Sequence, residues 1–239
     1  GELFNEINAN TGGINCGVEV FDRADSTEEF QAMFSVRGKA LYTKMDFLFK
    51  MIGEILNSSK LEDTKRLYEI VASVKSRAQV NLTGAGHSTA VLRAAAYSSP
   101  MAAFQDEMAG IGYYQFIEKL EKDFEQRKEE TVEELCKLMK KILRPENFMI
   151  SYTGERESLE TVQKLAGTVK AGLGTEPVEK SKEKLTCTKK NEGFKTSGQV
   201  QYVAQTGNFK KKGLEYTGAL EILKVILSYD YLWMNLRVK

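Results

Sequence analysis

The residue types that carry most enzyme chemistry are scarce in this sequence. It has a single histidine, His87, and three widely separated cysteines, Cys16, Cys136 and Cys187. A protease-type zinc site needs two histidines at helical spacing beside a carboxylate, and a structural zinc site needs closely spaced cysteine pairs. Neither pattern is present, so we expect no metal site within the chain. The odd number and wide spacing of the cysteines also argue against a disulfide framework and predict a reducing compartment.

The glycine-rich stretch around His87 matches no catalytic or phosphate-binding loop. Gly84 and Gly86 lack the third glycine of a dinucleotide fingerprint, and no lysine follows them as in a P-loop. A serine nucleophile would need a G-x-S-x-G turn with His87 as its base, and the sequence TGAGHST contains no such turn. Paired carboxylates are plentiful, but they lie on helical faces where solvation is the default. We therefore predict a flexible, structural turn at His87 and no catalytic residue within the chain.

Two alternating runs predict a pair of β-strands near the start of the chain. Apolar residues occupy alternate positions in residues 14–20 and 30–36, which is the period of a half-buried strand. The polar connector DRADSTEE between the runs allows antiparallel pairing. A short helix is expected ahead of them, ended by Gly12 and Gly13.

Helices are expected to dominate the next part of the chain. Apolar stripes at steps of three and four predict helices that face a core. The stripes run through residues 41–55, 67–78, 113–124, 132–142 and 159–169. Pro145 cannot continue the fourth of these helices, and the apolar run FMISYTG at residues 148–154 predicts a buried strand after it.

A change of composition divides the chain. The stretch between Gly172 and Gly193 is rich in lysine and glutamate and has little apolar periodicity, so we predict an interdomain linker at residues 175–193. After it, residues 199–205 predict one strand, and a stripe from Tyr216 predicts a long last helix. One strand and one helix cannot bury themselves in water. The expected fold class is therefore α+β, with helices packed on a mainly antiparallel sheet and a truncated second domain.

Composition and charge exclude several classes of protein. With 42% hydrophobic and 28% charged residues, the chain is typical of a globular protein. The formal net charge of +1 gives no field that would recruit nucleic acid or an anionic membrane. No apolar run approaches the roughly 18 residues needed to span a bilayer, and there is no signal peptide. We expect a cytoplasmic protein with no nucleic-acid or membrane partner.

Four stretches together resemble one family of enzymes. They are ELFNEINANTGGI, GAGHSTAVLRAAAYSSPMAAFQDEMAGIGY, ILRPENFMISYTGE and YDYLWMNLRVK. In their order and spacing they resemble the pitrilysin/insulinase superfamily of zinc metallopeptidases, and within it the presequence-protease (falcilysin-like) subfamily. The resemblance covers nearly the whole chain except the linker.

The resemblance implies a metallopeptidase-repeat fold and a place for this chain in it. Such enzymes have four related α+β domains in two halves that close over a chamber, with an inverted H-x-x-E-H zinc site in the first domain. Residues 1–174 would be most of the third, non-zinc domain, and residues 194–239 the beginning of the fourth. The zinc ligands would lie outside this chain, in the N-terminal half of the same polypeptide. That half and unfolded peptide substrates would be the partners of this chain.

One residue carries over from the family, Arg237 in the sequence LRVK. The family arginine works with a tyrosine six residues later, which here would lie beyond Lys239. The resemblance implies that Arg237 binds the substrate backbone or supports the negative charge that builds on the peptide carbonyl. The alternative is a helix-end arginine that interacts only with the helix dipole.

The function implied by the resemblance is that of a segment in the C-terminal half of an intracellular zinc metallopeptidase that degrades short unfolded peptides. The segment would form a chamber wall and support substrate binding. The enzyme would be active at full length, and this segment alone would be inactive. A non-catalytic structural or peptide-binding relative of the same fold is one alternative, and an unrelated interaction domain is another.

Overall fold

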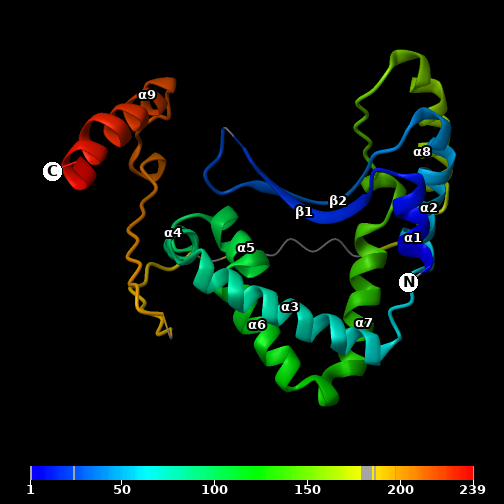
Figure 1. Ribbon diagram of the computed structural model, residues 1–239, viewed down its shortest axis with the longest axis horizontal. Coiled ribbons are helices and arrows are strands. Elements are labelled where there is room, and N and C mark those ends of the chain that lie inside the picture. The colour runs from blue at the N-terminus through cyan, green and yellow to red at the C-terminus, as the bar shows by residue number, and fades with distance from the viewer. Residues whose placement is uncertain (1, 24, 179–184, 186, 197, 239) are drawn as a thin grey trace.

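The computed structural model describes residues 2–23, 25–178, 185, 187–196 and 198–238. A long hairpin crosses the upper part of the molecule, helices lie below it and at one end of it, and the C-terminal helix stands apart from them (Figure 1). The helices are α1 (Glu2–Asn10), α2 (Met45–Ser58), α3 (Thr64–Gly84), α4 (Gly86–Ala96), α5 (Pro100–Ala109), α6 (Ile111–Lys122), α7 (Phe124–Ile142), α8 (Leu159–Ala171) and α9 (Gly218–Ile226). The strands are β1 (Ile14–Asp22) and β2 (Phe30–Gly38).

Strands β1 and β2 form the antiparallel pair that their alternation predicts. The register runs from Ile14 opposite Gly38 to Asp22 opposite Phe30. Helix α1 ends just before this hairpin, and Gly13 enters it with a φ of +106°. This left-handed conformation favours glycine, because a side chain there would be strained. The expected helix, glycine stop and hairpin are therefore confirmed.

The sheet is smaller than the sequence predicts. No third strand pairs with β1 or β2 among the residues that the structure describes. The predicted strands at residues 148–154 and 199–205 are wrong, because both segments are irregular, with Met149 69% and Val203 85% exposed. Alternation produces a strand only where a neighbouring strand offers its backbone and side chains. In its coarse form the expected α+β class is confirmed, as mixed helices with a small antiparallel sheet.

The predicted helical stripes are confirmed, with shifts at their ends. Helices α2, α3 and α8 cover three of the stripes, and α6 and α7 cover the other two. Asp123 separates α6 from α7 with a non-helical φ of −99° and ψ of 16°. The largest buried side chain of the core is Phe124, which is 2% exposed and stabilises the fold by about 1.5–3 kcal/mol. It packs in one cluster with Val71, Ile117 and Leu120.

The stretch around His87 is helical, which corrects the flexible turn predicted there. His87 is the second residue of α4, and α5 follows after a short break. Only Ala85, with a φ of −122° and ψ of 40°, separates α3 from α4. The alanine-rich sequence AVLRAAA favours a helix. The glycines therefore bend the chain between two helices and do not form a loop.

The predicted linker lies partly outside the described residues, which omit 179–184 and 186. Its described residues contain no helix or strand. Near its start, Nη1 of Arg144 donates a hydrogen bond to the carbonyl oxygen of Glu176. Near its end, the carboxylate of Glu192 pairs with Arg93 of α4. Both described ends of this segment are thus attached to the part of the chain that precedes it.

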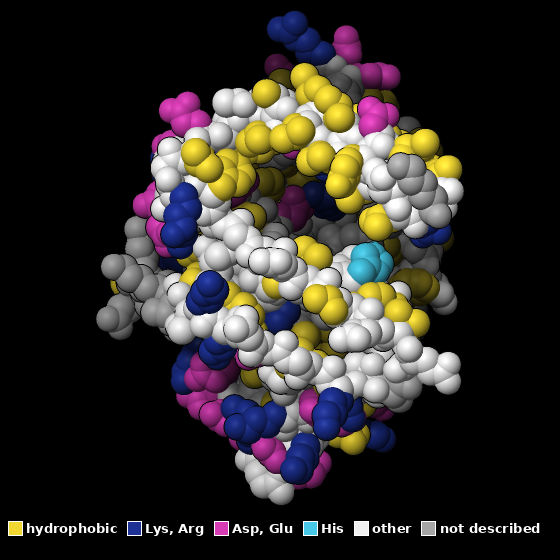
Figure 2. All heavy atoms as spheres, turned by 90° about the vertical axis from the view of Figure 1, so that its left-hand side faces the viewer, with side chains coloured by type: hydrophobic (Ala, Val, Ile, Leu, Met, Phe, Trp, Pro, Cys, Tyr) yellow, Lys and Arg dark blue, Asp and Glu magenta, His cyan; other side chains and the backbone are white. Residues whose placement is uncertain are grey.

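The long last helix is present and lies almost free of the rest of the molecule. Helix α9 continues into a π-helical segment at Leu227–Val238, and every residue from 221 to 238 is exposed. Figure 2 looks onto this end of the molecule, where hydrophobic side chains gather above His87. None of the helices in the described part of the chain is long and apolar enough to cross a membrane.

Candidate functional site

Arg237, the residue singled out by the family resemblance, lies near the end of the π-helical segment. Its guanidinium carbon is 5.8 Å from the ring centroid of Trp233, one helical turn earlier. Both residues are exposed, and a cation–π contact of this kind stabilises by about 0.5–1 kcal/mol. Arg237 therefore lies on an open helix surface beside an aromatic ring, where a ligand can reach it.

His87 takes part in packing. Its ring centroid is 6.2 Å from that of Tyr202, which belongs to the irregular segment after the linker. Gly86 beside it is buried, and a side chain at that position would collide with the Tyr202 ring. Gly86 and His87 thus form a notch on α4 that receives Tyr202. This contact gives His87 no partner for acid–base chemistry.

The described residues do not fit a zinc site. Nowhere in residues 2–23, 25–178, 185, 187–196 or 198–238 do three or more His, Cys, Asp or Glu side chains gather as metal ligands would. Zinc in proteins is held by three or four such ligands at short distances. A complete enzyme of the family that this sequence resembles would need zinc ligands from other parts of its polypeptide.

The most buried charge that the structure describes is the carboxylate of Asp106, which is 1% exposed. Its Oδ1 accepts a hydrogen bond from the backbone N–H of Ile111 at 3.0 Å, and its Oδ2 accepts one from Gly112 at 3.1 Å. These N–H groups open helix α6 and have no partner within that helix. Asp106, near the end of α5, therefore stabilises the start of α6 by hydrogen bonds and by its negative charge near the helix dipole.

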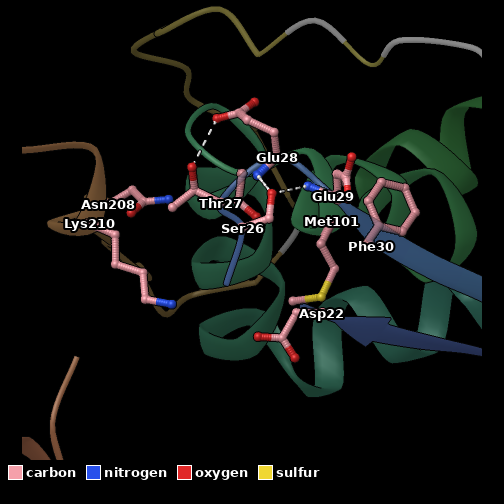
Figure 3. A pocket seen from close by; sticks show the side chains of 10 residues that line it. Asp22, Ser26, Thr27, Glu28, Glu29, Phe30, Met101, Asn208 and Lys210 are labelled. Atoms are coloured by element: carbon pink, nitrogen blue, oxygen red, sulfur yellow. Dashed lines mark hydrogen bonds between the residues drawn. The ribbon is translucent and has the colours of Figure 1, made fainter. Parts of the chain in front are cut away.

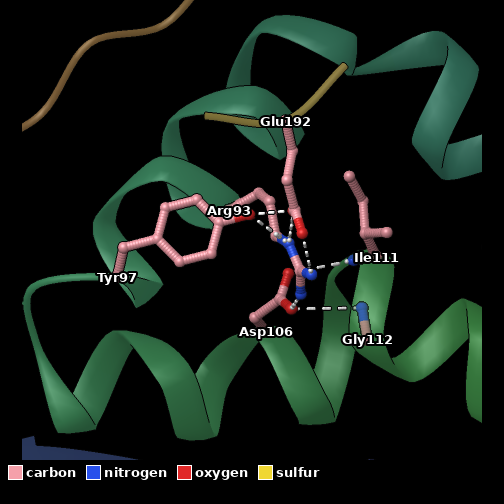
Figure 4. Close-up of polar contacts among 6 residues, drawn as sticks. All are labelled: Arg93, Tyr97, Asp106, Ile111, Gly112 and Glu192. Atoms are coloured by element: carbon pink, nitrogen blue, oxygen red, sulfur yellow. Dashed lines mark hydrogen bonds and ion pairs between the residues drawn. The ribbon is translucent and has the colours of Figure 1, made fainter. Parts of the chain in front are cut away.

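Arg93 of α4 completes this site, which Figure 4 shows from close by. Its Nη1 donates to Oδ2 of Asp106 at 2.6 Å, and its Nε donates to Glu192 at 2.9 Å and to the Tyr97 hydroxyl at 3.0 Å. The Tyr97 hydroxyl also donates to Glu192. The guanidinium lies 5.5 Å from the Tyr97 ring and 5.7 Å from the ring of Phe194. We call these five side chains the Arg93 cluster.

The charge on Arg93 is held by its partners. Burial by itself disfavours the charged form. Hydrogen bonds and ion pairs with Glu192 and Asp106 outweigh burial, so the pKa of Arg93 is raised above its ordinary value. The side chain is 19% exposed, and that of Asp106 is 2% exposed. Charge-assisted hydrogen bonds at such low exposure are among the stronger contacts in a protein.

Two glycines leave the space that the Asp106 carboxylate occupies. A side chain at Gly110 would collide with the Asp106 carboxylate, and one at Gly112 would lie 2.9 Å from its Oδ2. The stretch DEMAGIGY thus supplies Asp106 and, a few residues later, two glycines that leave space for its carboxylate. The sequence reasoning missed this site. Its available signal was an aspartate followed at four and six residues by glycines.

The Arg93 cluster is suited to binding and positioning, and it contains no nucleophile with an adjacent base. It joins residues of α4, α5 and the start of α6 to Glu192, near the end of the predicted linker. Separating the partners of such a buried pair leaves an uncompensated charge. The cluster therefore also stabilises one arrangement of α4, α5, the start of α6 and the chain around Glu192.

Two cavities lie outside this cluster. The first, about 110 Å³, is at the tip of the hairpin (Figure 3). It is lined by Asp22, Ser26, Thr27, Glu28, Glu29, Phe30, Ser99, Met101, Asn208 and Lys210. The second, about 290 Å³, lies between α2 and α8. Sites for small molecules usually have about 300–1,000 Å³, so the first cavity is well below this range and the second lies at its lower edge.

Comparison with known proteins finds one family whose profile matches this chain. The profile of the family described as "Peptidase M16C associated" matches residues 1–120, which is half of the chain. "Protein HypA" of Clostridium perfringens (strain 13 / Type A) is 34% identical over 238 residues, covering 100% of this chain and 24% of that protein.

Two similar relatives have descriptive names. "Presequence protease 1, chloroplastic/mitochondrial" of Arabidopsis thaliana is 26% identical, over 98% of this chain and 22% of that protein. "Presequence protease, mitochondrial" of Yarrowia lipolytica (strain CLIB 122 / E 150) is 26% identical, over 100% of this chain and 24% of that protein. The chain therefore spans about a quarter of the length of these relatives.

Proposed function

Because this chain belongs to the peptidase M16C associated family, we propose that it is a metal-free segment from the C-terminal half of a zinc metallopeptidase that degrades unfolded peptides. The observation that carries the proposal is the similarity of the entire chain to presequence proteases. Their names describe them as proteases of presequences. The substrate class proposed for the complete protein is accordingly short, unfolded peptides.

In this proposal the segment forms part of the chamber wall and has no catalytic metal of its own. Residues 1–174 belong to a third domain, residues 175–193 to a linker, and residues 194–239 to the beginning of a fourth domain. The exposed state of residues 221–238 supports this division. Most of these residues are large hydrophobics, and they are exposed from Ile222 to Val238. A contiguous apolar surface of this kind is normally covered by another part of a protein, so the rest of a domain is expected to cover it.

Arg237 is the proposed contact of this segment with substrate. Its exposed guanidinium beside Trp233 is placed on the helix surface that a covering chain or a peptide would meet. A planar guanidinium presents several N–H donors, which can donate hydrogen bonds to a peptide carbonyl oxygen. We place the complete enzyme in the cytoplasm. Some relatives are named as mitochondrial, so a fluorescent fusion of the full-length protein tests this placement.

The experiment that tests the function uses the full-length protein encoded by the complete reading frame. Incubation with an unfolded peptide, followed by mass spectrometry of the products, should show cleavage that a chelator abolishes and added zinc restores. The matched control replaces the glutamate of the upstream H-x-x-E-H motif by glutamine, which should stop cleavage without unfolding the protein. A folded full-length protein that holds no zinc and cleaves no unfolded peptide would instead support the non-catalytic relative.

A further inference from the structure

Residues from Glu192 onward, which include the last two residues of the predicted linker, lie along helix α4. Three contacts attach them. Glu192 pairs with Arg93 at 2.9 Å, Phe194 places its ring 5.7 Å from the Arg93 guanidinium, and Tyr202 fills the notch at Gly86. Arg93 and Gly86 are seven residues apart on α4, or about two turns of helix. The contacts on both helix turns involve the same segment, whose chain runs from residue 192 to residue 202.

We propose that α4 is a docking surface for residues 192–196 and 198–202, with Arg93 as the positioning residue that anchors them. Arg93 is suited to this role because its guanidinium is held by the carboxylate of Asp106. That carboxylate is held in turn by a backbone N–H group at the start of α6. An arginine on a flexible surface would lose side-chain entropy on pairing with Glu192. Arg93 is already immobilised, so its pairing with Glu192 avoids most of that loss.

The docking surface limits how far the C-terminal part of the chain can move. The linker predicted at residues 175–193 is attached to α4 near its end, at Glu192. Residues 203–238 then begin from a fixed point on α4. In the complete protein this start helps to set the position of Arg237. That last step rests on the proposed function, whereas the docking itself does not.

Hydrogen exchange of backbone amides tests the docking directly. The informative variant is Glu192→Gln, since it removes the negative charge that pairs with Arg93 and leaves the Arg93–Asp106 pair intact. We expect exchange of residues 187–196 to become about tenfold faster, the scale of one lost charge-assisted hydrogen bond. Exchange in α3 and α6 should stay unchanged.

Glu121→Gln is the matched control. Glu121 pairs with Lys75 at 2.6 Å and its side chain is 23% exposed, against 26% for Glu192, but it lies within the helical layer. Exchange of residues 187–196 should be the same in this variant as in the unaltered protein. Equal exchange of those residues in Glu192→Gln and the unaltered protein would overturn the proposal. So would an equal acceleration by Glu121→Gln.

A second variant tests the far end of the segment. Tyr202→Ala empties the notch at Gly86 and leaves Glu192 in place. We expect faster exchange of residues 198–204 with little change at residues 187–196. Unchanged exchange of residues 198–204 would show that Tyr202 does not attach these residues to α4. The docking surface would then be refuted for the part around Gly86.

The positioning role is measured on the full-length protein. Glu192→Gln should lower kcat/KM for an unfolded peptide several-fold at unchanged zinc content, and Glu121→Gln should not. Unchanged kcat/KM together with faster exchange would refute the positioning role. If the unaltered full-length protein cleaves no peptide, the proposed function fails, and the exchange result still decides whether Arg93 anchors the segment.

Discussion

Nη1 of Arg93 on α4 lies 2.6 Å from Oδ2 of Asp106 on α5, thirteen residues later in the chain. The same carboxylate accepts hydrogen bonds from two backbone N–H groups at the start of α6. One buried ion pair thus determines how three consecutive helices meet. The first predictions concern this pair and the space around it.

Asp106→Ala should lower the free energy of unfolding by about 3 kcal/mol. This is the lower end of the range for breaking a buried ion pair, because Arg93 keeps Glu192 as a second partner. Urea unfolding followed by circular dichroism measures the change. The control is Glu69→Ala, since the Arg66–Glu69 pair has side chains that are 67% and 51% exposed. An exposed pair contributes at most about 1 kcal/mol, so equal losses in both variants would contradict the role given to Asp106.

Gly112→Ala should destabilise the protein by about 1–3 kcal/mol, the usual range for overpacking. Its side chain would lie 2.9 Å from Oδ2 of Asp106, and three hydrogen bonds prevent that carboxylate from moving aside. Gly167 in α8 has open space around it, so Gly167→Ala should stabilise by up to about 1 kcal/mol through helix propensity. Thermal unfolding of the two variants should give shifts of opposite sign, and shifts of the same sign would count against this geometry.

Phe124→Ala should cost about 3–5 kcal/mol of stability, because it leaves a cavity beside Val71, Ile117 and Leu120. Phe116 on α6 is 53% exposed and supplies a matched control. Phe116→Ala should change the free energy of unfolding by well under half as much in the same urea titration. If the two substitutions had similar effects, Phe124 would not be the centre of the core.

Arg237→Ala in the full-length enzyme should lower kcat/KM by roughly 10²–10³, with zinc content and folding unchanged, if the guanidinium supports the reacting carbonyl. Arg237→Lys should recover only part of this loss, because lysine keeps the charge but not the planar pair of donors. Lys224→Ala, at an exposed cation on α9, is the control and should leave kcat/KM unchanged. A near-normal kcat/KM for Arg237→Ala would leave it as a helix-end arginine.

The isolated chain should hold no stoichiometric zinc and hydrolyse no peptide. One histidine and three scattered cysteines do not supply a set of zinc ligands. Elemental analysis after a chelator wash measures bound zinc, and mass spectrometry of an incubated peptide measures hydrolysis. One tightly held zinc per chain, or peptide cleavage that survives chelation, would contradict the prediction.

Elements whose pattern depends on near neighbours in the chain could be predicted from the amino-acid sequence alone. The stripe from Leu67 to Ala78 predicted α3, and the alternation of residues 14–20 and 30–36 predicted β1 and β2. A helix satisfies its backbone hydrogen bonds internally, and a hairpin does so with the next strand, so their signals are local. Relatives similar over the whole chain agree with the resemblance seen in its motifs.

In contrast, the folded chain was needed to see which polar residues meet and which predicted strands find a partner. Residues 148–154 have the apolar run of a buried strand and residues 199–205 have the alternation of a half-buried one, but neither segment pairs with a strand that the structure describes. Glu192 lies ninety-nine residues after Arg93, and no local pattern relates them. Their meeting depends on Asp106 holding Arg93 from the next helix and on glycines that leave room for its carboxylate. Such contacts form when distant segments pack together, because a buried charge is unfavourable unless it is paired.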